Sequence, residues 1–159
     1  MRVAFSTDDH NECAREVLSY LESVAEVAEL ATGGIWPEVG RAVGEAVASG
    51  RADLGVVMCW TGTGTSMAAN KVAGVRAALA WEPWIATGAR RWNDANVLAL
   101  STRRLAPAVA VECARAFIEA TEVDRDELPA IEQLKGYESL SRPTGGAAPP
   151  PPPWSGARP

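Results

Sequence analysis

Short apolar runs alternate with helically spaced apolar positions along most of the chain. Residues 3–6 have the length and composition of a short strand. The helical spacing i, i+3, i+4 and i+7 follows at Ala14, Val17, Leu18 and Leu21. Residues 53–59 are almost continuously apolar, which is typical of a strand covered on both faces in a parallel sheet. The pattern predicts further strands at 24–30, 75–80 and 96–100, and further helices at 38–49, 66–71, 82–91 and 106–120.

The alternation of strands and helices indicates an α/β fold. We expect a doubly wound, five-stranded parallel sheet in a Rossmann-like three-layer sandwich, with a C-terminal helix. Right-handed crossovers place the carboxyl ends of such strands along one edge of the sheet, where ligands bind. The loops after Ser6, Cys59 and Ala80, and the segment after Leu100, are expected to open at this edge.

Composition separates the chain into a domain and a tail. Residues 1–143 have the alternating pattern and the length of a single domain. Residues 144–159 contain the proline run 149–153, which fits neither a helix interior nor a central strand. We expect this tail to be a poorly ordered, extended polyproline II segment in solvent. The alternative is a proline-rich ligand for a partner domain.

Charge, hydropathy and cysteine content exclude several classes of protein. A net charge of −5 argues against nucleic-acid binding, which needs clustered Lys and Arg. The N-terminus lacks the apolar run of a signal peptide, and no stretch approaches the roughly 20 apolar residues of a membrane span. Three cysteines without a closely spaced pair fit a reduced protein, and Cys13 and Cys113 fall on helix faces that point to the core. We therefore expect a cytoplasmic protein that binds neither nucleic acid nor membrane.

The densest group of candidate functional residues begins at Cys59, where a predicted strand ends. Gly62 and Gly64 allow a tight turn, and a helix is expected to begin at Ser66. Backbone N–H groups and the positive end of the helix dipole then favour an anion or a developing oxyanion. A thiol beside a helix N-terminus ionises more readily and acts as a base or a nucleophile. The alternative is a buried cysteine followed by an ordinary strand-to-helix turn.

A second polar group directly follows the first predicted strand. Asp8 and Asp9 supply two carboxylates, and His10 is the only histidine of the chain. These side chains are expected at the edge of the ligand-binding crevice. Asp9 with Glu12 also fits a D-x-x-E capping box, so capping of the first helix is the alternative role.

Two more polar groups flank the fifth predicted strand. Residues 90–96 place dense polar side chains, including Asn93, before this strand, a composition that is also typical of turns. Arg103 and Arg104 follow the strand. There they either meet a phosphate group or form a solvated basic pair.

Several motifs, in order along the chain, resemble the family of type B ribose-5-phosphate isomerases and galactose-6-phosphate isomerase subunits. The most specific is C-W-T-G-T-G-T-S-M-A-A-N-K at residues 59–71, which is similar to the family's C-G-T-G-x-G-x-S-x-A-A-N-K. Residues 74–77 and 82–83 fit the next family stretch, and N-D-A-N-V-L at residues 93–98 matches N-D-x-N-V-L. The resemblance spans about residues 1–131.

The resemblance implies an enzyme that moves a proton between two carbons of a sugar through an enediolate. It implies that Cys59 is the base and that Thr61 supports it. It assigns the backbone anion hole to Gly62, Thr63, Gly64, Thr65 and Ser66. It assigns substrate contacts to Asp8 or Asp9 with His10, to Asn93, and to Arg103 as a phosphate-binding arginine. It further implies a homodimer, or a tetramer, with sites composed from two chains and without metal or cofactor.

Four exchanges distinguish this chain from the family pattern. Trp60 replaces the glycine after the cysteine, and Trp36 replaces a tyrosine. Trp92 stands where phosphopentose isomerases carry the histidine that assists ring opening, and an indole cannot exchange protons in that way. Arg125 matches one phosphate-binding arginine, whereas Pro129 stands near the second.

These exchanges predict a small, apolar pocket and a substrate that needs no ring opening, such as a four-carbon keto-phosphate. We expect an aldose–ketose isomerase of a small sugar or sugar phosphate other than ribose 5-phosphate. The alternative is a catalytically degenerate sugar-phosphate-binding protein, or one subunit of a hetero-oligomeric isomerase.

Overall fold

The computed structural model describes residues 1–30 and 34–140, so the predicted tail at 144–159 lies outside the described residues. The described elements are β1 (Arg2–Thr7), α1 (Glu12–Val24), β2 (Glu26–Glu29), α2 (Trp36–Ala48), β3 (Leu54–Cys59), α3 (Thr63–Ala69), β4 (Ala77–Leu79), α4 (Pro83–Asn93), β5 (Val97–Ser101), α5 (Pro107–Glu119), the 3-10 turn η1 (Arg125–Glu127) and α6 (Leu128–Leu140).

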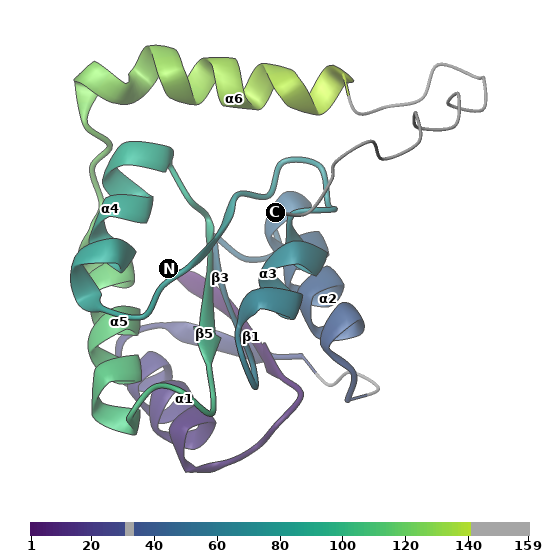
Figure 1. Cartoon of the computed structure of the whole chain (residues 1–159), viewed down its shortest axis with the longest axis vertical. Coiled ribbons are helices and arrows are strands. Elements are labelled where there is room, and N and C mark those ends of the chain that lie inside the picture. The colour runs from purple at the N-terminus through teal and green to yellow at the C-terminus, as the bar shows by residue number, and fades with distance from the viewer. Residues whose placement is uncertain (31–33, 141–159) are drawn as a thin grey trace, which may run out of the picture.

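The five strands form one parallel sheet in the order β2-β1-β3-β5-β4, which confirms the predicted doubly wound α/β fold. Helices α1, α4 and α5 cover one face, and α2 and α3 cover the other, so the domain has three layers (Figure 1). The register aligns Thr7 with Met58 and Cys59 with Ser101. The carboxyl ends of β1, β3 and β5 therefore meet at one edge, as the crossover rule requires.

The central strands are buried on both faces, as expected for a parallel sheet between two helix layers. One core cluster lies between the sheet and α1, α4 and α5, with Phe5, Leu98 and Phe117 among its fully buried side chains. A second cluster joins the other face to α2 and α3 through Val43 and Val57. Cys113 is buried in the first cluster, as its helical spacing predicted.

The edge strands are shorter than the hydrophobic runs suggest. The run at 24–30 yields a strand only at Glu26–Glu29, and the run at 75–80 only at Ala77–Leu79. Each edge strand has one neighbour in the sheet, so fewer of its residues are held in ladder hydrogen bonds. The prediction of a helix start at Ser66 was also wrong, because α3 already begins at Thr63.

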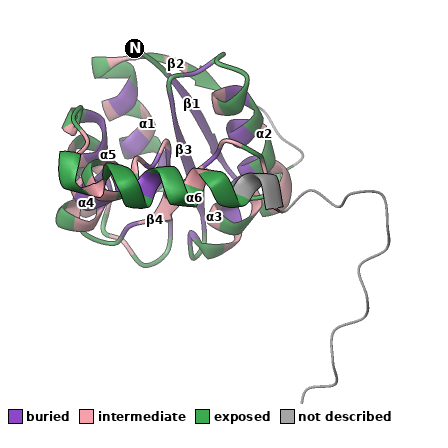
Figure 2. Cartoon of the chain, turned by 90° about the horizontal axis from the view of Figure 1, so that it is seen from above, coloured by how far each residue is buried: buried purple, intermediate pink, exposed green. Residues whose placement is uncertain are grey.

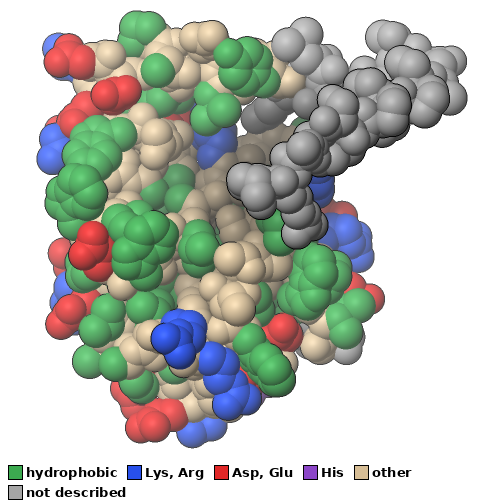
Figure 3. Space-filling model, in the orientation of Figure 1, with side chains coloured by type: hydrophobic (Ala, Val, Ile, Leu, Met, Phe, Trp, Pro, Cys, Tyr) green, Lys and Arg blue, Asp and Glu red, His purple; other side chains and the backbone are tan. Residues whose placement is uncertain are grey.

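Helix α6 crosses one edge of the domain and is mostly exposed (Figure 2). Ile131 is its buried anchor, with 2% of its surface exposed, whereas Leu128, Leu134 and Tyr137 are exposed apolar side chains. Hydrophobic patches also lie among charged side chains on the face shown in Figure 3. Across the described residues, every helix is too short or too polar to cross a membrane.

Candidate active site

Cys59 ends the buried strand β3 and turns its sulfur toward the start of α3. Only 4% of its surface is exposed. The backbone N–H of Gly62 donates to the sulfur at 3.2 Å. The hydroxyl of Thr65 lies 3.5 Å from the sulfur and 3.1 Å from Gly62 O, so the two acceptors share its one proton. Both contacts suit a thiolate, which accepts hydrogen bonds and is the form of cysteine that attacks or removes a proton.

The turn that follows requires glycine at position 62. Gly62 has φ +76°, a left-handed conformation that side chains disfavour. A Cβ there would also lie 2.5 Å from Cδ1 of Leu79 and 3.0 Å from the carbonyl carbon of Leu100. This turn brings the amide groups of Thr63, Gly64 and Thr65 into the first turn of α3, where N–H groups have no acceptor within the helix.

A cavity of about 330 Å³ opens beside Cys59. Its lining consists of Asp8, Trp36, Cys59, Trp60, Thr61, Thr63, Gly64 and Met67. The predicted residues Asp8, Cys59, Thr61, Thr63 and Gly64 are therefore brought together. The Trp36 ring packs against Gly64, where a Cβ would approach its carbons to 2.9 Å.

Three of these lining residues, Trp36, Trp60 and Met67, were not among the predicted catalytic and substrate-binding residues. Trp36 lies far from Cys59 in the sequence, at the start of α2. Only its match to a family tyrosine related it to the site. Met67 follows Thr63 by four residues, so both lie on one face of α3. This spacing is the sequence signal that identifies Met67 once the helix start is known.

Asp8 carries an unmet hydrogen-bonding requirement inside this site. Its Oδ1 atom is buried without a hydrogen-bond partner among the described residues. Burial, and then the charge of Asp9, raise the pKa of the Asp8 carboxyl above its ordinary value. A carboxyl that lines a cavity and has an oxygen without a partner is suited to a ligand hydroxyl.

The capping-box prediction for Asp9 was wrong. Asn11 is the N-cap of α1, and its side-chain oxygen accepts a hydrogen bond from the Ala14 N–H at 3.1 Å. The helix therefore starts later than the D-x-x-E pattern implied, and the Asp9 carboxylate is directed elsewhere. It forms an ion pair with Nε of Arg103 at 3.1 Å.

His10 is largely exposed and lies 3.9 Å from the Glu29 carboxylate through Nδ1. It is not among the residues that line the Cys59 cavity. Arg103 is also absent from that lining and lies behind one of the lining residues. Its guanidinium carbon sits 5.0 Å above the ring of Trp60, which does line the cavity.

Three other predicted site residues are directed away from the cavity. The backbone N–H of Ser66 donates to Gly62 O within α3, and its hydroxyl donates to Ala77 O at 3.3 Å. Asn93 ends α4, and Arg125 lies in η1 after α5. Helices α4 and α5 run antiparallel to the strands, and their last residues therefore lie at the amino edge of the sheet. Asn93 and Arg125 follow this course and lie at the edge opposite Cys59.

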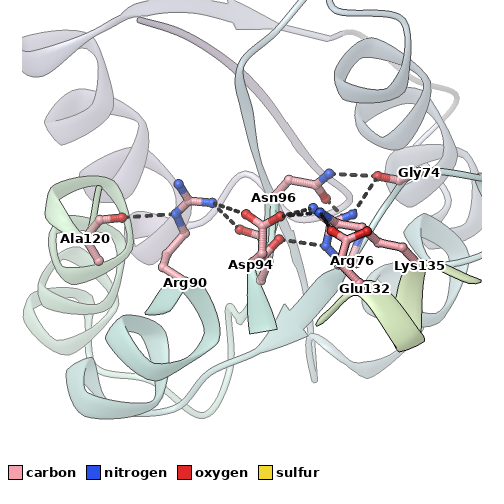
Figure 4. Close-up of polar contacts among 9 residues, drawn as sticks. Gly74, Arg76, Arg90, Asp94, Asn96, Ala120, Glu132 and Lys135 are labelled. Atoms are coloured by element: carbon pink, nitrogen blue, oxygen red, sulfur yellow. Dashed lines mark hydrogen bonds and ion pairs between the residues drawn. The ribbon is translucent and has the colours of Figure 1, made fainter. Parts of the chain in front are cut away.

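The amino edge holds a network of charges centred on Asp94 (Figure 4). The Asp94 carboxylate pairs with Arg76 at 2.9 Å, with Lys135 of α6 at 3.4 Å and with Arg90 at 4.0 Å. Asn96 joins the network by donating to Gly74 O and by accepting from the Arg76 N–H. This network holds α6 and the loop before β4 against the amino edge of the sheet.

Two motif asparagines serve the backbone. Beside the Asn96 contacts, the Asn70 side chain donates to Ala77 O at 2.8 Å and accepts from the Ala77 N–H at 2.8 Å. Trp92 is likewise engaged, since its indole N–H donates to Asp124 at 2.9 Å and its ring meets Trp84 edge-on. Trp92 is therefore not part of the Cys59 cavity lining within one chain.

Within the described residues, no cluster of three His, Cys, Asp or Glu side chains is placed to hold a metal ion. The chemistry that the cavity offers is that of its own groups. The residues that line it supply a cysteine sulfur, a partly buried carboxyl, threonine hydroxyls and amides from the start of α3. Such a set suits proton transfer at a carbon beside a carbonyl group.

Comparisons of the sequence and of the structure with known proteins all find sugar-phosphate isomerases. The family model described as Ribose/Galactose Isomerase matches residues 3–134. The D-erythrulose-4-phosphate isomerase of Pectobacterium atrosepticum is 35% identical over 104 residues, which cover 65% of this chain and 68% of that protein. The ribose-5-phosphate isomerase B of Escherichia coli is 35% identical over 127 residues, covering 75% and 81%. The structure of Clostridium thermocellum ribose-5-phosphate isomerase B superposes with a TM-score of 0.84 at 31% identity, covering 89% of this chain and all of that one.

Proposed function

The chain belongs to the ribose/galactose isomerase family, and we propose that it interconverts the aldose and ketose forms of a small sugar phosphate. The observation that carries this proposal is Cys59, whose sulfur accepts a hydrogen bond from the Gly62 N–H and which lines a cavity with the first turn of α3. A base and a set of oxyanion donors facing one space are the two requirements of enediolate chemistry.

In the proposed reaction, the Cys59 thiolate removes a proton from the carbon beside the substrate carbonyl. The electron pair of the broken C–H bond forms the enediolate, whose negative oxygen faces the N–H groups of Thr63 and Gly64, which line the cavity. The Cys59 thiol then returns the proton to the neighbouring carbon. Asp8 holds the substrate hydroxyls through its carboxyl, which lines the cavity, and Thr61 extends this polar wall.

We propose a four-carbon substrate, because the cavity is small and Trp92 cannot act as an acid for ring opening. A four-carbon sugar with phosphate on its last oxygen has no hydroxyl that can close a five-membered ring onto its carbonyl group. It therefore reaches the enzyme in the open form. The relative named D-erythrulose-4-phosphate isomerase supports this choice.

We further propose that the site is completed by a second copy of the chain. Asn93 and Arg125, which the family resemblance assigns to the substrate, lie at the edge opposite Cys59 within one chain. A single chain therefore cannot bring them to the same substrate as Cys59. A dimer with two-fold symmetry would pair the carboxyl edge of one copy with the amino edge of the other, twice.

The reaction is tested by proton exchange in heavy water across phosphorylated and free sugars of four to six carbons. We expect deuterium at the carbon beside the carbonyl of the four-carbon keto-phosphate, and less with longer substrates. Exchange reports the enediolate step even where net turnover is slow. Absence of exchange with every sugar would contradict an isomerase.

The composite site is tested by mixing two inactive variants, Cys59→Ala and Asn93→Ala. If each site uses Cys59 of one copy and Asn93 of the other, a mixed dimer has one intact site. Random reassortment of an equal mixture then recovers about a quarter of the wild-type activity per chain. No recovery, with dimers shown to exchange, would mean that both residues act within one chain.

A further inference from the structure

Trp60 and Arg103 are in contact with each other at the wall of the Cys59 cavity, and we refer to them as the Trp60–Arg103 unit. Trp60 lines the Cys59 cavity, yet 60% of its surface is exposed, and its ring lies 5.0 Å from the guanidinium carbon of Arg103. Such a stacked cation contacts the negative face of the indole. A large exposed indole in this position has no core to fill, so its role lies in what it holds.

The backbone of this unit is tied at several points. The Ser101 hydroxyl donates to Trp60 O at 2.6 Å, and the N–H groups of Arg103 and Arg104 both donate to the Ser101 oxygen. The Arg103 N–H also donates to Trp60 O at 3.3 Å. The loops after β3 and β5 therefore move together, and Arg103 keeps its place relative to Cys59.

The side chain of Arg103 is held on two sides. Its guanidinium carbon lies over the Trp60 ring at 5.0 Å, and Asp9 pairs with Nε at 3.1 Å. Asp9 is itself 3.5 Å from the side-chain amide of Asn11, the cap of α1. With Nε engaged by Asp9 and the guanidinium carbon held over the Trp60 ring, the remaining edge of the fork carries the two Nη groups, which bind phosphate oxygens in pairs.

We propose that Trp60 is a positioning residue that fixes Arg103 as the phosphate anchor of a short substrate. This inference rests on the proposed sugar-phosphate isomerase function. The reacting carbons lie at Cys59, and the phosphate lies beyond Trp60 at the Nη edge of Arg103. The separation between sulfur and guanidinium then sets the length of the substrate, and Asp9 balances the Arg103 charge when no phosphate is bound.

The test measures binding, so that it stands apart from turnover. Calorimetry compares 4-phosphoerythronate, a four-carbon mimic of the enediolate, with erythronate, which lacks the phosphate. In Trp60→Leu the dissociation constant of the phosphorylated mimic is expected to rise about two- to fivefold, the strength of an exposed cation–π contact. The constant for erythronate is expected to rise less, because erythronate meets Trp60 in the cavity but has no phosphate for Arg103 to bind.

Two variants control for general effects. Trp60→Phe keeps an aromatic face and is expected to restore most of the phosphate-dependent affinity. Trp81→Leu removes an indole of almost equal exposure, 61%, from the loop after β4 and is expected to change neither constant. In an Arg103→Met background, Trp60→Leu is expected to add no further loss, because the two residues act as one unit.

The outcomes separate this inference from the proposed reaction. Equal losses for both mimics, or equal effects of Trp60→Leu and Trp81→Leu, overturn the role of Trp60 even if the isomerase is active. A phosphate-selective loss in Trp60→Leu supports it even if no sugar undergoes proton exchange.

Discussion

The two edges of the sheet carry polar side chains of opposite character. At the amino edge, Asp94 lies within ion-pairing distance of Arg76, Arg90 and Lys135, so its charge is compensated several times (Figure 4). At the carboxyl edge, the Asp8 carboxyl oxygen and the Thr102 hydroxyl are buried without hydrogen-bond partners among the described residues.

This contrast shows that the number of charges at an edge does not identify the edge with the candidate active site. The amino edge has the denser cluster, but its groups satisfy one another and hold α6 in place. Buried polar groups are normally paired, and the exceptions mark sites where something else supplies the partner. We expect substitutions at the carboxyl edge to reduce proton transfer and substitutions at the amino edge to reduce stability.

The largest expected effect is the loss of proton transfer in Cys59→Ala. Removal of a general base costs about 10²- to 10⁴-fold in kcat/KM. Deuterium exchange at the substrate carbon measures this loss directly. Cys113→Ala, which removes a buried thiol from α5, is the matched control and is expected to retain exchange. Similar exchange rates for Cys59→Ala and wild type would remove Cys59 from the mechanism.

Gly62→Ala is expected to lower the free energy of unfolding by about 2–4 kcal/mol. The alanine would be strained in the left-handed conformation, and its Cβ would also clash with Leu79 and Leu100. Gly50→Ala separates the two causes. Gly50 has φ +73° but nothing within 4 Å of its Cβ position, so it should lose only about 1–2 kcal/mol. Urea unfolding measures both. Equal losses would mean that Leu79 and Leu100 move aside without cost.

Asp94→Asn tests the amino edge. The amide keeps the size of the side chain and tolerates its φ of +49°, but it loses the charge that faces Arg76 and Lys135. We expect the free energy of unfolding to fall by about 1–2 kcal/mol, since these groups are partly buried. Glu132→Gln, at the exposed rim of the network, should change it by only a few tenths. A larger loss of stability in Glu132→Gln than in Asp94→Asn would mean that the exposed Glu132–Lys135 pair stabilises this edge more than Asp94 does.

The smallest effect concerns the pH dependence of stability in Asp8→Asn. Folding raises the pKa of Asp8, so the folded protein binds this proton more tightly than the unfolded chain. The wild-type free energy of unfolding therefore falls as pH rises from the ordinary value of 3.8 through the raised value of the folded protein. Asp8→Asn lacks this decrease, so its stability relative to wild type should improve across that window.

Urea unfolding at a series of pH values measures this difference. A difference that stays constant with pH, or that changes in favour of the wild type, would show that Asp8 does not carry a raised pKa.

Much of the fold was predictable from the period of apolar residues. Strand β3 is apolar at nearly every position because helices cover both of its faces. A continuous apolar run is therefore enough to predict it. The edge strands β2 and β4 were overestimated, because the apolar run continues past the residues that the single neighbouring strand pairs. The start of α3 was missed because Gly62 caps it through backbone conformation rather than through a side chain.

The candidate site was predictable where neighbouring residues share one turn. Cys59, Thr61, Thr63 and Gly64 reach one cavity because the turn after β3 folds on itself. Contacts between separate segments were not predictable from spacing. The ion pair between Asp9 and Arg103 joins residues from the two loops after β1 and β5, and only the packed sheet brings them together.

The Asn70 side chain has a consequence for the sheet as a whole. Strand β4 lies at the edge of the sheet, where unused backbone groups form a template for pairing with another chain. Asn70 occupies both the N–H and the carbonyl of Ala77, as a neighbouring strand would. One side-chain amide thus closes part of the open edge and guards the domain against edge-to-edge aggregation.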